Sequence, residues 1–134
     1  MGFDQYHEPP EELPAQTRTF ARMCANLTEE AEAIGWYMQR MALEPDPDAL
    51  AIMEDSLGEE FKHFSMNLEF LFRTNPKWRE IARGILFQDG DIVENGEAAE
   101  AAAGDSDEDA APDGAAGNGR GTTGLGIGTL RKAD

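Results

Sequence analysis

Two groups of residues in this chain have the types and spacing needed to bind a metal ion. Glu60 and His63 form a Glu-x-x-His motif, and a separation of three residues places both side chains on one face of a helix. Glu30 interrupts a line of apolar residues that recurs in steps of three and four, so its carboxylate is expected at the edge of a buried face or inside it. A carboxylate in that position is costly unless a cation or another partner compensates it. Glu30, Glu60 and His63 are therefore candidate metal ligands.

The number of histidines decides how such a site can be completed. Helical di-iron carboxylate sites use a glutamate from each of two helices and a Glu-x-x-His motif from each of two more, because carboxylate oxygens and imidazole suit iron. This chain has one such motif and one facing glutamate, and His7, the only other histidine, lies outside any Glu-x-x-His. The sequence therefore predicts a site shared between two identical chains. For each half alone, the alternative is a salt-bridged glutamate or an interior histidine with satisfied hydrogen bonds.

Three helices are expected to position these residues. The apolar pattern predicts a first helix from Pro14 to about residue 44 and a second from Pro47 to about Asn75. Asp46 is a suitable N-cap for the second helix. The Asn75-Pro76 pair starts a short third helix. No strand pattern competes, so the predicted fold class is all-α.

The two long helices are expected to form an antiparallel hairpin, because their connection is short. Glu30 lies 14 residues before Glu44, and Glu60 lies 14 residues after Asp46, so the hairpin brings the two candidate ligands to the same height. One hairpin has a single internal partner surface and leaves apolar area uncovered. We therefore expect two chains to dimerise into a four-helix bundle.

Composition excludes several classes of partner. The chain has 11 basic and 27 acidic residues and a formal net charge of −16, which argues against binding to nucleic acid or to an anionic membrane surface. Cys24 is the single cysteine, so no disulfide can form within the chain, and a buried thiol is the simple expectation. No apolar stretch approaches the about 20 residues that a membrane span requires. We expect a soluble protein that stays inside the cell.

The chain divides into three parts by charge and composition. Residues 1–87 contain the helical pattern, whereas residues 88–118 contain ten acidic residues and no basic one. A segment rich in Gly, Ala, Asp and Glu is typical of disorder, so residues 88–123 are predicted to be an acidic linker. Residues 124–134 follow it and carry three large apolar residues with the character of a docking peptide: Leu125, Ile127 and Leu130.

The quoted motifs resemble those of a known family, the encapsulated ferritins. The resemblance rests on residues 29–40 (EEAEAIGWYMQR) and 59–63 (EEFKH), within a region from about residue 8 to 90. Separately, residues 124–131 (GLGIGTLR) look like an encapsulin-targeting peptide. Two independent matches in one chain are difficult to obtain by chance.

The resemblance implies a ferritin-like fold and a ferroxidase, an enzyme that oxidises Fe(II) to Fe(III) with dioxygen. It implies a centre of two iron ions per pair of subunits, with Glu30, Glu60 and His63 of each subunit as ligands and Tyr37 beside them. It also implies an outer site through which metal reaches this centre, formed by Glu29, Glu32 and Trp36.

The same resemblance implies the assembly and the location. Dimers would form a ring-shaped oligomer, held by the C-terminal peptide inside an encapsulin nanocompartment of the bacterial cytoplasm, where iron is stored and detoxified. Two residues depart from the family pattern: Lys62 lies inside the Glu-x-x-His motif and Gly35 precedes Trp36, both at positions where an acid is expected.

Two other functions fit the same residues. The first is a non-catalytic helical cargo or adaptor protein, which metal-binding measurements would identify. The second is a peroxide-consuming di-iron protein of the ferritin-like group, which a comparison of oxidants would identify.

Overall fold

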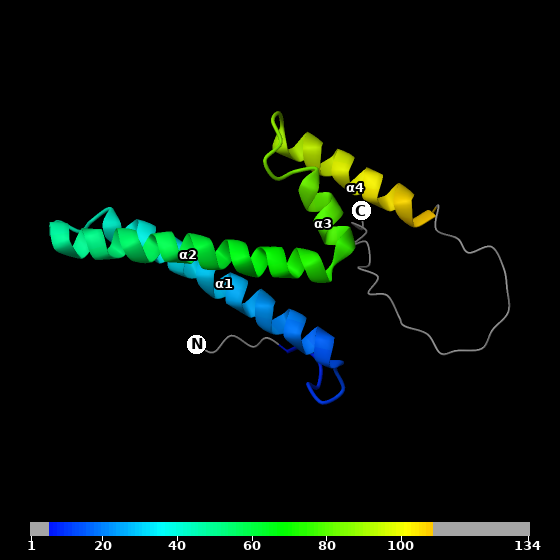
Figure 1. Cartoon of the computed structure of the whole chain (residues 1–134), viewed down its shortest axis with the longest axis horizontal. Helices are drawn as coiled ribbons and strands as arrows, with labels where there is room; N and C mark the ends of the chain where they lie inside the picture. Colours follow the sequence, from blue (N-terminus) through cyan, green and yellow to red (C-terminus); the bar gives the residue numbers. More distant parts are fainter. Residues whose placement is uncertain (1–5, 109–134) are drawn as a thin grey trace, which may run out of the picture.

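The computed structural model describes residues 6–108 and contains four helices in that range: α1 (Ala15–Met41), α2 (Pro47–Thr74), α3 (Pro76–Arg83) and α4 (Ile92–Glu108). Figure 1 shows α1 and α2 as a long crossed hairpin, with α3 and α4 at the end far from the α1–α2 turn. The part of the chain that is described contains no strand, so the all-α ferritin-like fold class is confirmed. None of the described helices is both long enough and apolar enough to cross a membrane.

The helix boundaries follow local chemistry that the sequence predicts. The Asp46 side chain accepts hydrogen bonds from the backbone N–H groups of Asp48 and Ala49. Pro47 suits the first position of α2, because a backbone N–H there would have no partner within the helix. Asn75 repeats the arrangement for α3, because its side chain accepts from the backbone N–H of Trp78. These caps fix where the hairpin turns and where α3 departs from α2.

The core lies where α1, α2 and α3 meet. Leu71 is completely buried, and Phe72 packs edge-on against Trp78 with ring centroids 5.1 Å apart. Phe20 of α1 contacts the same indole at 6.4 Å, so Trp78 joins three helices. Edge-to-face aromatic pairs of this kind contribute about 0.5–1.5 kcal/mol beyond their buried area.

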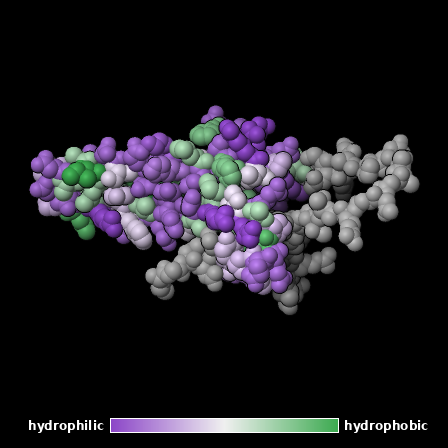
Figure 2. Space-filling view, turned by 60° about the horizontal axis from the view of Figure 1, so that its bottom comes forward, coloured by the Kyte–Doolittle hydropathy of each residue, from purple (hydrophilic) through white to green (hydrophobic). Residues whose placement is uncertain are grey.

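Large apolar side chains remain at the surface along the hairpin. On the two long helices, Trp36, Met38, Ile52, Phe61, Met66 and Phe70 are exposed. Figure 2 shows hydrophobic side chains at the surface of the molecule between hydrophilic ones. Within one chain each long helix has only one long partner, which leaves this area uncovered.

The segment after residue 87 differs from the expectation of an unfolded linker over residues 88–123. The structure forms α4 from Ile92 to Glu108 within that segment. Asp91 caps the helix by accepting from the N–H groups of Val93 and Glu94. Alanine and glutamate favour helix, and an acid in the first turn suits the helix dipole. Residues 109–123 of this segment lie outside the described residues.

Helix α4 packs on α3 through very small residues. The position that a Cβ atom would take on Gly84 lies only 2.5 Å from the Cβ of Ala99, so the two backbones approach closely. Ala103 of α4 is buried beside Gly84 and Ala99. The two large apolar residues of α4, Ile92 and Val93, are exposed, so this helix buries surface through small residues, which composition alone does not reveal.

The connection between α3 and α4 holds an aromatic residue in an uncommon conformation. Phe87 has a φ of 59° and is completely exposed. The Gln88 side chain donates to the Arg83 carbonyl, and the Asn95 side chain donates to the Asp89 carbonyl. These bonds fix the connection on either side of Phe87.

Candidate metal centre

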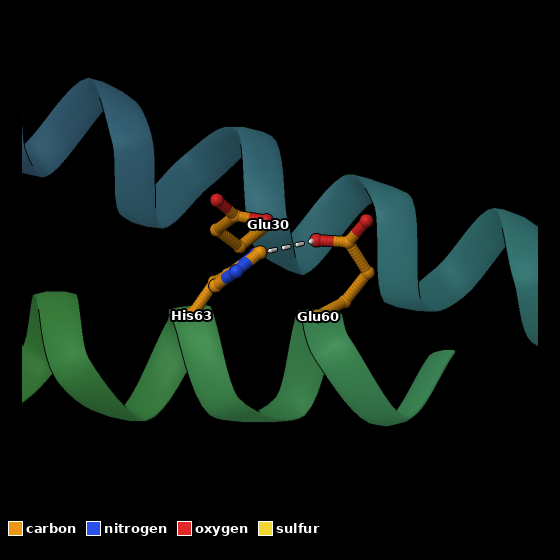
Figure 3. A group of neighbouring side chains, drawn as sticks. All are labelled: Glu30, Glu60 and His63. Carbon is orange, nitrogen blue, oxygen red and sulfur yellow. Dashed lines mark ion pairs between the residues drawn. The ribbon is translucent and has the colours of Figure 1, made fainter. Parts of the chain in front are cut away.

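The three candidate ligands meet across the two long helices. Glu30 lies on α1, and Glu60 and His63 lie one turn apart on the facing side of α2 (Figure 3). Each offers a ligand atom, and these atoms all lie within 4.8 Å of one another. Among the described residues this is the one group of three or more histidine, cysteine or acidic side chains that could hold a metal ion.

The helical register explains why these three residues converge. Glu60 and His63 are separated by one turn, and His63 Nδ1 lies 3.5 Å from Glu60 Oε2. The hairpin then brings Glu30 of α1 to the height of this pair. Glu30 and Glu60 are half-buried, whereas 45% of the His63 side chain is exposed to solvent. The open side of the group therefore lies at His63.

The neighbouring Glu60 carboxylate disfavours the charged form of Glu30 when no cation is present. A hydrogen bond with Glu60 raises the pKa of Glu30 above its usual value, and burial and the charge of Glu60 act in the same direction. The nearby His63 opposes the shift. A cation between the carboxylates would favour the charged form of Glu30 and so displace its proton.

The donor set fits iron. Two carboxylates and one imidazole supply the oxygen and nitrogen ligands that iron accepts in both oxidation states. The set is half of the arrangement of glutamates and Glu-x-x-His motifs found in helical di-iron proteins. A second copy of the chain would supply the other half.

Lys62, the basic residue inside the Glu-x-x-His motif, pairs with Glu59 through its ammonium group. This hydrogen bond, followed by the lysine charge, lowers the pKa of Glu59 below its usual value. The same Glu59 carboxylate lies 3.8 Å from His63 Nε2. Sequence reasoning did not single out Glu59, although its spacing of four residues from His63 is the available signal.

Tyr37 and Trp36 have a common neighbour in Arg40. The Arg40 guanidinium lies 5.7 Å from the Tyr37 ring centroid and 6.0 Å from that of Trp36, within the range of cation–π contacts. Trp36 is exposed and lines a shallow surface pocket with Gln39 and Arg40. The sequence analysis did not identify Arg40. Its positions three residues after Tyr37 and four after Trp36 would have indicated these contacts.

The remaining predicted site residues are placed as follows. Glu29 and Glu32 are exposed on α1, and the described residues add no third carboxylate, histidine or cysteine to them. Leu125, Ile127 and Leu130 lie outside the described residues. Cys24 is partly buried in α1, and burial raises the pKa of its thiol.

The fold and the donor set define a helical carboxylate-histidine protein of the ferritin-like class. Residues 5–89 match the EncFtn-like family, which covers more than half of the chain. The chain belongs to the EncFtn-like family.

Individual relatives agree with this assignment. An encapsulated ferritin-like protein of Rhodospirillum rubrum is 42% identical over 125 residues, which are 93% of this chain and 86% of the relative. A ferritin-like protein of Thermotoga maritima is 44% identical over 91 residues, 68% of this chain and 80% of the relative. A crystal structure of a protein from Nitrosomonas europaea matches with a TM-score of 0.64 and 35% identity, covering 66% of this chain and 98% of the other.

Proposed function

We propose that this protein is a ferroxidase that oxidises Fe(II) to Fe(III) with dioxygen at a di-iron centre shared between two subunits. The observation that carries the proposal is the convergence of Glu30, Glu60 and His63 from two helices, with ligand atoms within 4.8 Å. Membership of the EncFtn-like family supports it. Fe(II) is the substrate: each ion gives one electron to dioxygen, which is reduced with uptake of protons.

The residues of this chain have separate tasks in that reaction. Glu30, whose pKa the neighbouring Glu60 raises, would give up its proton when a cation binds, and both carboxylates would supply negative charge to the bound cations. His63 adds a neutral nitrogen ligand at the open side of the group. By family resemblance, Tyr37 lies beside the centre, where the Arg40 guanidinium holds its ring.

A homodimer completes the site and covers the exposed apolar area. Phe61, Met66 and Phe70 of α2 are exposed on the helix that carries the Glu-x-x-His motif. Two hairpins packed together would bury such side chains in a four-helix bundle and bring two half-sites together. Assembly of these dimers into a ring follows from the family resemblance.

The proposed location is the interior of an encapsulin shell in the bacterial cytoplasm. The relative from Rhodospirillum rubrum is named an encapsulated ferritin-like protein, and its similarity extends over 93% of this chain. The C-terminal residues 124–131 carry the proposed targeting peptide, in which Leu125, Ile127 and Leu130 are the apolar anchors. The shell would then receive the oxidised iron for storage and detoxification.

Glu29, Glu32 and Trp36 are proposed to serve metal delivery. Glu29 is adjacent to Glu30, and its charge contributes to the raised pKa of the Glu30 carboxyl. A charge that disfavours deprotonation of Glu30 also attracts a cation to the same place. Glu29 and Glu32 are exposed, so salt would screen this attraction.

Ligand variants test the ferroxidase proposal. Glu60→Ala and His63→Ala should retain the helices, seen by circular dichroism. Both should lose rapid Fe(II) oxidation, measured by stopped-flow absorbance when anaerobically purified protein with Fe(II) is mixed with dioxygen. Loss of an outer hydrogen-bond partner already costs about 10–100-fold at metal sites, so loss of a ligand should exceed that range. Glu54→Ala, an exposed glutamate on the same helix, is the matched control.

The outcome also separates the rival functions. Oxidation at the parental rate in either ligand variant would show that the ligand set is wrong. A parent protein that binds no iron would be a non-catalytic cargo or adaptor. Faster oxidation with hydrogen peroxide than with dioxygen would identify a peroxide-consuming protein.

A further inference from the structure

The His63 imidazole lies between two carboxylates of its own helix. Its Nδ1 faces Glu60 at 3.5 Å, inside the group of candidate ligands, and its Nε2 faces Glu59 Oε2 at 3.8 Å. Glu59 is in turn paired with Lys62. Lys62, Glu59 and His63 therefore form a chain of contacts that leads from the surface to the centre.

We propose that Glu59 is a positioning residue for His63, and that Lys62 holds Glu59 in place for this task. The inference rests on the proposed function, because it requires His63 to be a metal ligand. Glu59 itself would not touch the metal. It would act on the nitrogen of the imidazole that faces away from the centre.

The physical basis is the asymmetry of the imidazole ring. When one ring nitrogen binds a metal, the other carries the proton, and the group that accepts from that N–H fixes the tautomer and the orientation of the ring. With Nδ1 toward Glu60, the free N–H is at Nε2, and Glu59 is the carboxylate on that side. The 3.8 Å separation is longer than a hydrogen bond, so a small change in the Glu59 side-chain torsions completes the contact.

Lys62 explains why Glu59 is available for this role. The exposed Glu59 side chain keeps 54% of its accessible area and would sample several rotamers if it were unpaired. Pairing with Lys62 restrains it beside His63. On this view the lysine inside the Glu-x-x-His motif supports the ligand instead of competing with the metal.

The competing account is an ordinary surface ion pair. Exposed pairs three or four residues apart on a helix contribute little to stability, and removing one would leave the metal site unchanged. Glu69 and Arg73 form such a pair on α2, with 2.8 Å between Arg73 Nε and Glu69 Oε1. Glu69→Ala is therefore a matched control, because it removes the same charge and also breaks one intrahelical pair.

The test measures the tautomer directly. The chain contains only two histidines, so ¹⁵N NMR of the full-length protein loaded with Zn(II), a diamagnetic ion that accepts the same ligand types, can resolve the His63 ring. In the parent we expect Nδ1 bound and Nε2 protonated. Glu59→Ala should give mixed ring signals and lower the Zn(II) affinity by about 10-fold or more, whereas Glu69→Ala should match the parent.

For Lys62 variants, simple electrostatics and the positioning role predict opposite changes in Zn(II) affinity. Removing a cation near a metal site should by simple electrostatics tighten Zn(II) binding. The positioning role instead predicts weaker binding and mixed ring signals for Lys62→Met, with recovery in Lys62→Arg. Tighter binding by Lys62→Met would overturn the role of Lys62.

Failure of this inference can be distinguished from failure of the proposed function. Parental ring signals and affinity in Glu59→Ala would overturn the positioning role if His63→Ala still loses Zn(II) binding. Parental Zn(II) affinity in His63→Ala would overturn the ligand assignment itself.

Discussion

Glu30 links the protonation of the metal-free site to the stability of the hairpin. It lies on α1, and the residues it meets lie on α2, so its proton is part of the contact between the two helices. The hydrogen bond with Glu60 is the main cause of its raised pKa. A divalent cation would replace this proton with a stronger link.

The raised pKa of Glu30 predicts a dependence of stability on pH. The folded protein keeps the Glu30 proton to a higher pH than the unfolded chain, whose pKa is near 4.5. The stabilising contribution is therefore complete below about pH 4.5 and is lost as the pH rises through the raised pKa. We expect the melting temperature of the metal-free protein, measured with a chelator present, to fall over this window.

Two variants isolate the contribution of Glu30 from that of the many other acids. Glu30→Gln keeps a hydrogen-bond donor toward Glu60 and should flatten the dependence, whereas Glu32→Gln, an exposed neighbour, should retain it. An unchanged pH profile in Glu30→Gln would show that the Glu30 proton does not contribute to stability.

At the scale of the elements, α4 depends on one close backbone approach. Gly84 ends α3, and Ala99 lies in the middle of α4. With a φ of −79°, Gly84 does not need to be glycine for its backbone conformation, so space is the reason for glycine at this position. The contact is what allows a helix of small residues to remain docked.

We expect Gly84→Ala to displace α4. Its Cβ would lie 2.5 Å from the Ala99 Cβ and 3.4 Å from the Ala99 Cα, which α4 can relieve only by moving. Overpacking of this kind costs about 1–3 kcal/mol. Hydrogen exchange of the α4 backbone amides should show lost protection, and Ala99→Gly in the same chain should restore it in part.

Gly104→Ala is the control for the same substitution in a helix. No atom lies within 4 Å of its added Cβ, so it should stabilise α4 by about 0.5–1 kcal/mol through the lower flexibility of the unfolded chain. Equal protection of α4 in Gly84→Ala and Gly104→Ala would contradict the close-packing account.

At the scale of the whole molecule, activity should follow the population of dimers. In the proposed shared centre one chain holds only half of the ligands, so iron should draw two halves together by mass action. We expect specific activity, measured by stopped-flow oxidation over a dilution series, to fall more steeply than first order. A monomer isolated by size exclusion that kept full activity would contradict a shared centre.

The C-terminal peptide makes a separate prediction about the assembly. Deleting residues 124–134 should leave oxidation and oligomer size intact and abolish capture by a cognate encapsulin shell, because the proposed anchors lie far along the chain from the proposed metal ligands. Co-purification with the shell on co-expression measures capture.

A fluorescent protein fused to residues 119–134 should be captured, and Leu125→Asp with Ile127→Asp should release it. Equal capture of both fusions would show that the shell does not recognise these apolar residues.

The sequence by itself determined the first three helices and the meeting of the three candidate ligands. The caps at Asp46 and Asn75 act on backbone groups two or three residues away, so local chemistry is enough to place the starts of α2 and α3. The spacing of Glu60 and His63 fixes their common face in the same way. Equal distances from the turn then predicted that Glu30 meets them, which the structure confirms.

Only the tertiary structure decided how the small residues and the charged neighbours of the site are used. Helix α4 is held by the approach of Gly84 to Ala99, a contact between separate elements that neither periodicity nor composition encodes. Glu59 contacts both Lys62 and His63 because of the side-chain rotamers that these residues adopt. The spacing of the three residues permits these rotamers but does not select them. Local hydrogen bonding and helical periodicity can be read along the chain, whereas close packing and rotamer choice depend on which surfaces meet.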